Sequence, residues 1–113
     1  MIRLPPFTYV APRTLDEAVR AMTDAGPDGM LVAGGTDLYP NMKRRQFTPE
    51  VLVSLRRAVD RTIGTTASGG AAETFHIGAG ATLTQIADHP AVRQGYQALA
   101  QAAGLVSTPQ LRN

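Results

Sequence analysis

An apolar run that stops at two glycines is the part of this sequence best suited to binding chemistry. The run Met30–Ala33 is wholly apolar, Gly34 and Gly35 follow it, and a polar stretch restarts at Thr36. A strand, a glycine turn and a helix leave the first helical amides without partners, pointing at whatever lies in the turn. Glycine tolerates positive φ, and its missing side chain lets a phosphate approach the backbone. The turn therefore favours a phosphate or pyrophosphate ligand.

Two side chains of the turn bear on that interpretation. Thr36 can add a hydroxyl donor, whereas Asp37 can cap the helix but would repel a phosphate if its carboxylate faced the turn. The turn lacks a following Gly-Lys-Ser/Thr and the third glycine of a dinucleotide fingerprint, which excludes both better-known phosphate loops. On spacing alone, a tight turn with an Asp or Thr N-cap remains the alternative.

Composition excludes several other kinds of site. The chain has no cysteine, which excludes disulfides, thiolate metal sites, iron-sulfur clusters ligated by this chain and cysteine nucleophiles. His76 and His89 are too few for a zinc site without carboxylate help, so we expect solvated or capping histidines and no metal-binding or catalytic residue. Aromatic residues make up 5% of the chain and the formal charge is +2, which does not favour nucleic-acid binding. No stretch has the length of a membrane span or signal peptide, and we expect a cytoplasmic protein.

The first part of the chain alternates between predicted strands and helices. Thr14 and Glu17 form a capping-box pattern, in which the Glu17 carboxylate bonds the Thr14 amide, and predict a helix over 15–25. The other predicted elements are an edge strand within 5–10, strands covered on both faces at 30–33 and 51–55, and a helix from 37 to about 45.

The second part is richer in small residues and turns. The predicted elements are a hairpin of 61–66 with 74–79 whose tip is 67–72, a short helix capped by Thr82 or Thr84, and an amphipathic helix from Ala91 to Ala103. The alternation predicts an α/β fold (α+β overall), with a β-α-β subdomain at 1–58 and the beginning of a second, mixed subdomain at 59–113.

Several segments together resemble the start of the FAD-binding subunit of molybdenum hydroxylases. They are FTYVAPRTLDEAVRAM, LVAGGTDLYPNMKRR, EVLVSLRR, FHIGAGATLTQIADHPAV and LVSTPQLRN. That family includes the medium subunits of carbon monoxide dehydrogenase and 4-hydroxybenzoyl-CoA reductase, and the flavin domain of xanthine dehydrogenase. The resemblance runs over essentially the whole chain in order, so the combination is specific although each motif alone is not.

The resemblance implies the N-terminal part of a two-subdomain FAD-binding fold of the PCMH type. It implies that the glycine turn wraps the FAD phosphates and that the residue at the position of Val106 lies near the flavin. The implied FAD-binding residues are Leu31, Val32, Ala33, Gly34, Gly35, Thr36, Asp37, Leu38 and Val106. In the same way, the small residues Gly78, Ala79 and Gly80 are expected to admit the cofactor closely.

The resemblance also implies an oxidoreductase subunit that transfers electrons, with no catalytic residue on this chain. Electrons would pass from a molybdopterin-binding large subunit through a [2Fe-2S] small subunit to this FAD, and then to an external acceptor. Lys43, Arg44 and Arg45 are expected to stabilise the C-terminal end of their helix, with a subunit contact as the alternative.

One departure from the family pattern concerns the end of the sequence. In the family, the run resembling QLRN precedes a second glycine-rich turn of the type Thr-Ile-Gly-Gly-Asn, whereas this sequence ends at Asn113. We therefore expect a truncated, split or cleaved polypeptide that is inactive alone and binds FAD weakly or not at all unless a partner, such as the missing C-terminal part, completes it. The alternatives are a remnant that serves only in protein interaction and an unrelated nucleotide-phosphate binder.

Overall fold

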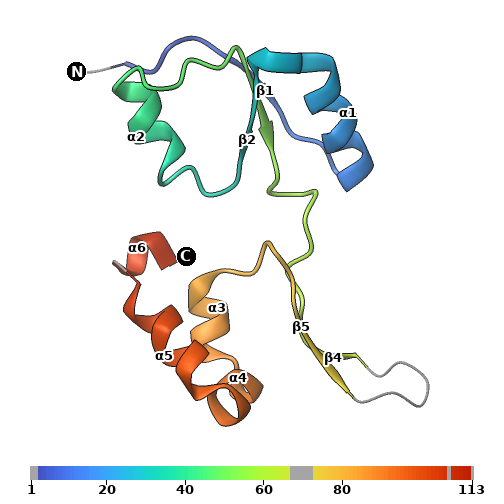
Figure 1. The fold of residues 1–113 in the computed structure, drawn as a ribbon, viewed down its shortest axis with the longest axis vertical. Helices are drawn as coiled ribbons and strands as arrows, with labels where there is room; N and C mark the ends of the chain where they lie inside the picture. The colour runs from blue at the N-terminus through green and yellow to red at the C-terminus, as the bar shows by residue number, and fades with distance from the viewer. Residues whose placement is uncertain (1–2, 67–72, 107, 113) are drawn as a thin grey trace. The chain divides into compact units, whose positions relative to one another are not determined.

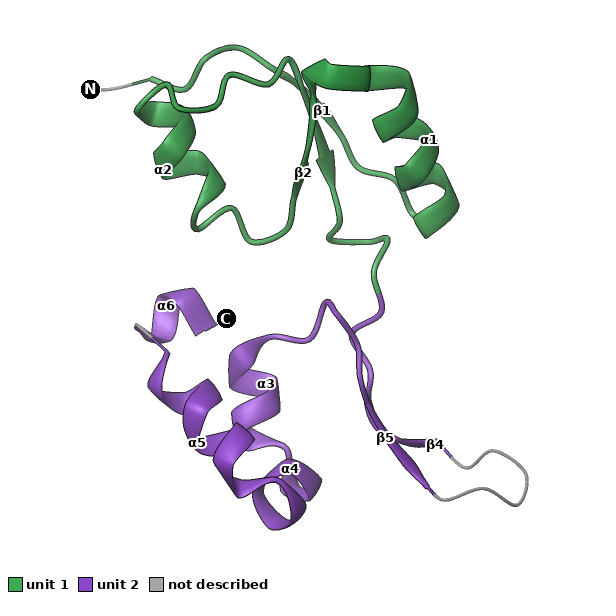
Figure 2. Cartoon of the chain, viewed as in Figure 1, with its two compact units in different colours: residues 1–59 green, residues 60–113 purple. Residues whose placement is uncertain are grey.

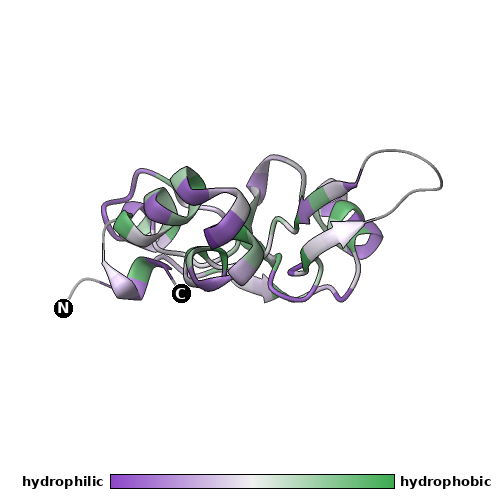
Figure 3. Ribbon diagram, turned by 90° about the horizontal axis from the view of Figure 1, so that it is seen from below, coloured by the Kyte–Doolittle hydropathy of each residue, from purple (hydrophilic) through white to green (hydrophobic). Residues whose placement is uncertain are grey.

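The computed structural model describes residues 3–66, 73–106 and 108–112. The chain divides into two compact units, residues 1–59 and residues 60–113 (Figure 2). Each unit contains both strands and helices, which confirms the predicted mixed α/β class. Residues of both hydropathy classes occur on the helices (Figure 3), as expected for helices that pack on one face and meet solvent on the other.

The first unit is built on a three-stranded parallel sheet. Its strands are β1 (Thr8–Val10), β2 (Gly29–Val32) and β3 (Val51–Ser54), in the order β1-β3-β2. The central strand β3 is covered on both faces as predicted, because Leu52 and Val53 are fully buried. The same expectation was wrong for β2, where Leu31 is 46% exposed, because β2 lies at the edge of the sheet.

Helices lie on both sides of these strands (Figure 1). Met42 of α2 (Leu38–Lys43) packs with Val32 and Leu52 into one core cluster. The partly buried residues around that cluster are Leu4, Phe7, Met30, Leu38 and Tyr39. Side chains alternate along a strand, so Val53 points to the opposite face, where α1 (Leu15–Ala25) lies against β3.

The capping interactions of α1 follow the predicted pattern only in part. The Thr14 hydroxyl accepts from the Glu17 amide at 3.1 Å, as expected. The prediction of a return bond from the Thr14 amide to the Glu17 carboxylate was wrong. That carboxylate instead accepts from the amide of the preceding residue, Arg13, at 2.9 Å. Gly26, with φ of 58°, ends the helix as predicted and begins the short 3-10 helix η1 (Gly26–Asp28).

The C-terminal end of α2 closes in a Schellman motif with an arginine where glycine is favoured. The Gln46 amide donates to the Asn41 carbonyl at 3.0 Å, and the Arg45 amide donates to the Met42 carbonyl at 3.0 Å. Arg45 consequently has a φ of 62°, the left-handed conformation that strains residues with a Cβ.

The turn between β2 and α2 depends on Gly35. Its φ is 75°, and a Cβ added there would collide with the ring of Tyr39. Tyr39 is tied back to the turn, because its amide donates to the Gly35 carbonyl at 3.1 Å. The absence of a side chain at Gly35 is therefore a requirement of the chain's own fold.

The second unit begins with the predicted hairpin. Strands β4 (Ile63–Thr66) and β5 (Thr74–Ile77) pair antiparallel, and the predicted tip at 67–72 lies outside the described residues. Four helices follow: α3 (Leu83–Asp88), α4 (Pro90–Gly95), α5 (Gln97–Leu105) and α6 (Pro109–Arg112). The single helix predicted over 91–103 was wrong, because the chain breaks at Tyr96 (φ −137°, ψ 57°) directly after the poor helix former Gly95.

Helix caps and one core cluster organise these helices. Thr82, one of the two predicted caps, forms a complete capping box: its hydroxyl accepts from the Gln85 amide at 3.1 Å, and the Gln85 side chain accepts from the Thr82 amide at 2.9 Å. The core comprises Ile86, Val92 and Ala103, surrounded by partly buried side chains such as Phe75 and Ile77.

The two histidines serve the fold of this unit. The Nδ1 atom of His89 accepts from the Ala91 amide at 3.2 Å, the expected capping role. The Nε2 atom of His76 lies 2.7 Å from the Asp60 carboxylate. That carboxylate also accepts from the Thr62 amide at 2.9 Å and from the Thr62 hydroxyl at 2.8 Å. The Thr62 amide, followed by the His76 hydrogen bond and the Thr62 hydroxyl, lowers the pKa of Asp60 from 3.8 to about 2.

The lowered pKa of Asp60 predicts an acid-sensitive contribution to the stability of the second unit. Because the folded value is lower than the ordinary one, ionised Asp60 stabilises the fold above about pH 4, and this contribution disappears as the pH falls from about 4 to about 2. NMR titration of the Asp60 carboxyl carbon should give the value near 2. Thr62→Val keeps the amide donor, so it should raise the pKa only in part; an ordinary pKa of 3.8 in the wild type would contradict the assignment.

Replacing Gly35 by alanine should destabilise the first unit more than replacing Gly26 by alanine. Both glycines have positive φ, so each substitution should lower the free energy of unfolding by about 1–3 kcal/mol. A Cβ at Gly26 meets nothing within 4 Å, whereas one at Gly35 also meets the Tyr39 ring. Urea unfolding followed by circular dichroism measures both variants; equal losses would show that the Tyr39 ring does not restrict this turn.

Arg45→Gly should stabilise the first unit. Relief of the left-handed strain outweighs the extra chain entropy that glycine loses on folding, for a net gain of about 0.5–1 kcal/mol in the free energy of unfolding. Arg44, with φ of −81°, provides the control, because Arg44→Gly adds entropy loss without relieving strain and should destabilise the same unit. Denaturant unfolding of the two variants should give changes of opposite sign.

Candidate functional site

The structure brings eight of the nine predicted FAD-binding residues together in one continuous segment. Leu31 and Val32 are the last residues of β2, Ala33 to Asp37 form the following loop, and Leu38 is the first residue of α2. We call Ala33 to Asp37 the glycine loop. It leaves the carboxyl end of a strand in a parallel sheet, the edge at which α/β proteins generally bind ligands. Val106 lies in the second unit, directly after α5.

The backbone amides of the glycine loop are available as donors. Within the described part of the chain, the amides from Gly34 to Leu38 donate to no protein acceptor. The next amide is already used, since Tyr39 donates to the Gly35 carbonyl. Consecutive amides without partners form the kind of concave donor surface that binds phosphate oxygens.

The two glycines of the loop differ in what surrounds them. A Cβ added at Gly34 would have the Thr36 Cγ2 atom, 4.0 Å away, as its nearest neighbour, so the chain leaves that position open. At Gly35 the equivalent space is filled by Tyr39. Gly34 is therefore the position at which a ligand can approach the backbone, and Gly35 is the position that makes the turn.

The side chains of the loop are exposed, and one predicted role is wrong. The Asp37 side chain makes no capping hydrogen bond, and its backbone is already helical (φ −102°, ψ −45°) instead of in the extended conformation typical of an N-cap. Thr36 is exposed, so its hydroxyl can reach a ligand from outside the loop.

Two arginines follow β3, the strand next to β2, at the same carboxyl end of the sheet. The Leu55 amide donates to the Val32 carbonyl at 2.8 Å, so the chain leaving β3 begins beside the end of β2. Arg56 and Arg57 come next and are exposed. The buried Ser54 hydroxyl accepts from the Arg56 amide at 3.2 Å and fixes this exit. The sequence alone did not single out this arginine pair as part of the site. The pairing of β3 beside β2 is what places the pair at the carboxyl ends of these strands.

Val106 is presented at the C-terminal end of α5. Its side chain is 43% exposed, and the preceding Leu105 is 80% exposed. Its carbonyl accepts from the Arg112 Nη1 atom at 3.3 Å, and the same nitrogen donates to the Gly104 carbonyl at 2.5 Å. Sequence reasoning missed Arg112, whose contact with α5 depends on α6 folding back.

The small residues at 78–80 are expected to let the cofactor approach closely, but Gly78 has no open space beside it. A Cβ added at Gly78 would collide with the Asp60 backbone. The Gly80 amide donates to the Asp60 carbonyl at 2.7 Å, and the Gly78 amide donates to the Thr62 carbonyl at 2.8 Å. Gly78 is therefore required for the packing of this chain on itself.

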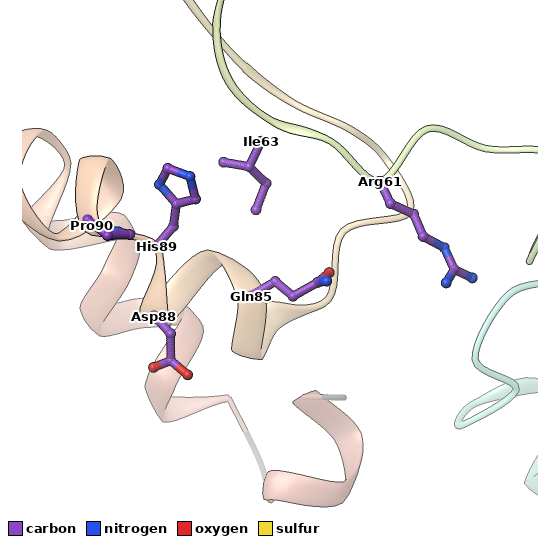
Figure 4. Close-up of a pocket in the computed structure, with 6 residues that line it drawn as sticks. All are labelled: Arg61, Ile63, Gln85, Asp88, His89 and Pro90. Carbon is purple, nitrogen blue, oxygen red and sulfur yellow. The ribbon is translucent and has the colours of Figure 1, made fainter.

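A surface hollow of the second unit contains none of the nine predicted residues (Figure 4). It is lined by Arg61, Ile63, Gln85, Asp88, His89 and Pro90. Its polar groups already serve the helices: the Gln85 side chain and the His89 ring accept capping bonds, and Asp88 lies 3.3 Å from Arg93. The contacts of these groups thus account for their presence without a ligand.

Residues 3–66, 73–106 and 108–112 contain no cluster of three or more potential metal-ligating His, Asp or Glu side chains. No helix within these ranges has the length and hydrophobicity needed to cross a membrane.

Comparison with known proteins identifies relatives along almost the whole chain. It is 36% identical over 110 residues to the nicotinate dehydrogenase FAD-subunit of Eubacterium barkeri, covering 95% of this chain and 35% of that protein. It is 37% identical over 109 residues to the carbon monoxide dehydrogenase medium chain of Hydrogenophaga pseudoflava, covering 96% of this chain and 37% of that protein. The chain therefore spans about a third of the length of these relatives.

Solved structures confirm the fold. A carbon monoxide dehydrogenase from Hydrogenophaga pseudoflava that lacks the Mo-pyranopterin moiety superposes with a TM-score of 0.85 at 36% identity, covering 98% of this chain and 37% of that one. Quinoline 2-oxidoreductase from Pseudomonas putida 86 gives a TM-score of 0.79 at 27% identity, covering 98% of this chain and 37% of that one. The expected PCMH-type FAD-binding fold is therefore confirmed.

The family assignment rests on a match over residues 5–113 to the FAD binding domain in molybdopterin dehydrogenase. The match includes the glycine loop and Val106, and it confirms the resemblance on which FAD was expected as cofactor. The chain belongs to the FAD-binding domain family of the molybdopterin dehydrogenases, and its relatives are oxidoreductase FAD subunits.

Proposed function

We propose that the segment from Leu31 to Leu38 holds the pyrophosphate of FAD and that Val106 contacts the flavin. The observation that carries this proposal is the set of amides without partners from Gly34 to Leu38, beside an open α-carbon at Gly34. Family membership supports FAD as the ligand, and the exposure of Val106 leaves an apolar side chain available for a ring.

Each part of the loop has a definite task in this proposal. The free amides donate to the pyrophosphate oxygens, and Gly34 lets those oxygens approach the main chain. Gly35 and Tyr39 hold the loop in the conformation that aligns the amides. Arg56 and Arg57 place positive charge at the same edge and offset the repulsion that the exposed Asp37 carboxylate exerts on a phosphate. Val32 and Leu38 pack in the core cluster and anchor the loop to the sheet and helix, whereas Leu31 is exposed just before the loop.

The chain acts, in this proposal, as the electron-transfer component of a multi-subunit molybdenum enzyme. When bound, FAD supplies electron transfer between the iron-sulfur clusters of a small subunit and an external acceptor. A molybdopterin-binding large subunit would carry substrate oxidation. The name of one relative, a carbon monoxide dehydrogenase medium chain, supports an assembly of this kind. A remnant without cofactor is less favoured, because no acceptor among the described residues takes the amide donors from Gly34 to Leu38.

Gly34→Val tests the phosphate-binding role directly. A Cβ at Gly34 has Thr36 Cγ2, 4.0 Å away, as its nearest neighbour, and a valine there places methyl groups where the pyrophosphate would lie, so FAD affinity should fall at least about tenfold, or about 1.4 kcal/mol. Titration with FAD and with ADP, followed by the amide NMR signals of Gly34 to Leu38, detects weak as well as tight binding. Both ligands should shift these signals in the wild type.

Gly64→Val is the matched control for Gly34→Val. A Cβ at Gly64 meets nothing within 4 Å, much as the one at Gly34 meets only Thr36 Cγ2 at 4.0 Å, and Gly64 lies in β4 of the second unit. Its FAD and ADP affinities should equal those of the wild type. Equal affinities in the Gly34→Val variant, or a wild type whose loop amides respond to neither ligand, would refute the proposed function.

A further inference from the structure

Among the described residues, the C-terminal end of α5 is held by the side chain of Arg112. The helices α3 and α4 end with backbone caps, from the His89 amide to Ile86 and from the Tyr96 amide to Val92. At the Val106 end of α5 no backbone cap is present among the described residues. The Arg112 guanidinium takes that place, since its Nη1 atom donates to two carbonyl groups of this end, those of Gly104 and Val106.

Arg112 reaches these carbonyls because α6 folds back. The Arg112 and Leu111 amides donate to the Thr108 carbonyl at 3.2 Å and 3.0 Å, which forms the turn that begins α6. The guanidinium then lies at the negative end of the α5 dipole, where a cation is favoured. One charged group therefore restrains the main chain on both sides of Leu105.

We propose that Arg112 is a positioning residue for flavin binding: its guanidinium fixes the main chain at Val106 so that this exposed apolar side chain meets the flavin ring. The inference rests on the proposed function, in which Val106 contacts the flavin. It assigns no contact between Arg112 and the cofactor itself.

The exposure of the neighbouring side chains explains why such a restraint is needed. Leu105 and Val106 both project into solvent at the end of α5. An apolar side chain gains free energy by leaving water, so an unrestrained helix end would relax toward burial of these groups. Hydrogen bonds from a charged donor to two carbonyls oppose that relaxation and keep Val106 available.

The experiment compares FAD with ADP in the wild type and in Arg112→Met. ADP lacks the flavin, so it should shift the Gly34 and Gly35 amide signals but not the Val106 methyl signals, whereas FAD should shift both. In Arg112→Met, FAD affinity should fall about tenfold and the FAD-induced shift of Val106 should decrease. ADP affinity should remain that of the wild type, a separation that general destabilisation would not give.

Three further variants complete the experiment. Arg112→Lys keeps a cationic donor and should recover most of the FAD affinity. Arg93→Met is the matched control, since Arg93 Nε donates to the Ala87 carbonyl near the end of α3 at 3.0 Å, a similar contact elsewhere in the same unit. Its thermal unfolding midpoint should fall comparably while its FAD affinity stays unchanged. If Arg112→Met unfolds the second unit, Arg112→Gln provides the same comparison with a neutral donor.

The outcomes separate this inference from the proposed function. Wild-type FAD affinity and an unchanged Val106 shift in the folded Arg112 variants would overturn the positioning role alone. Equal losses of FAD affinity in Arg112→Met and Arg93→Met would also overturn it, because the effect would then be structural. A wild type in which FAD shifts neither the loop amides nor Val106 would overturn the proposed function and this inference with it.

Discussion

The parallel pairing of β3 with both β1 and β2 is the constraint on which the first unit depends. Leu52 and Val53 are fully buried on opposite faces of β3, so the strand supplies both the α2-side core and the α1-side contact. Parallel pairing also fixes the direction of every strand, which brings the exits of β2 and β3 to one edge. The glycine loop and the arginines after β3 both follow strand ends on that side of the sheet because of backbone pairing.

The glycine loop shows how a fold can separate conformation from binding within two adjacent residues. Gly35 is constrained by the chain itself, through its positive φ and the Tyr39 ring. The packing does not exclude a side chain at Gly34, since a Cβ added there would have Thr36 Cγ2, 4.0 Å away, as its nearest neighbour. A glycine that the fold does not need is best explained by something outside the fold, and the neighbouring amides are donors suited to an anion.

Local signals allowed several elements to be predicted from the sequence. Helix α1 follows from Thr14 and the Gly26 stop, and the loop follows from the apolar run and its glycines. The exposure of Leu31 was not predictable in this way, because it depends on β2 lying at an edge that only the order β1-β3-β2 defines. The break at Tyr96 was missed for a similar reason. Val92 and Ala103 both pack in the core cluster of Ile86, and the chain bends between them to bring both there. Tertiary packing outweighed the helical periodicity there.

The proposed site uses main-chain groups more than side chains, and this explains what the sequence could and could not reveal about it. Amides from Gly34 to Leu38 donate whatever side chains they carry, so only the glycines leave a recognisable signal. Val106 similarly depends on where its backbone is held, and that position depends on Arg112, a residue six places further along the chain. Few side-chain identities therefore determine the proposed site, and they are those that set backbone conformation: the glycines at the turn and Arg112 at a helix end.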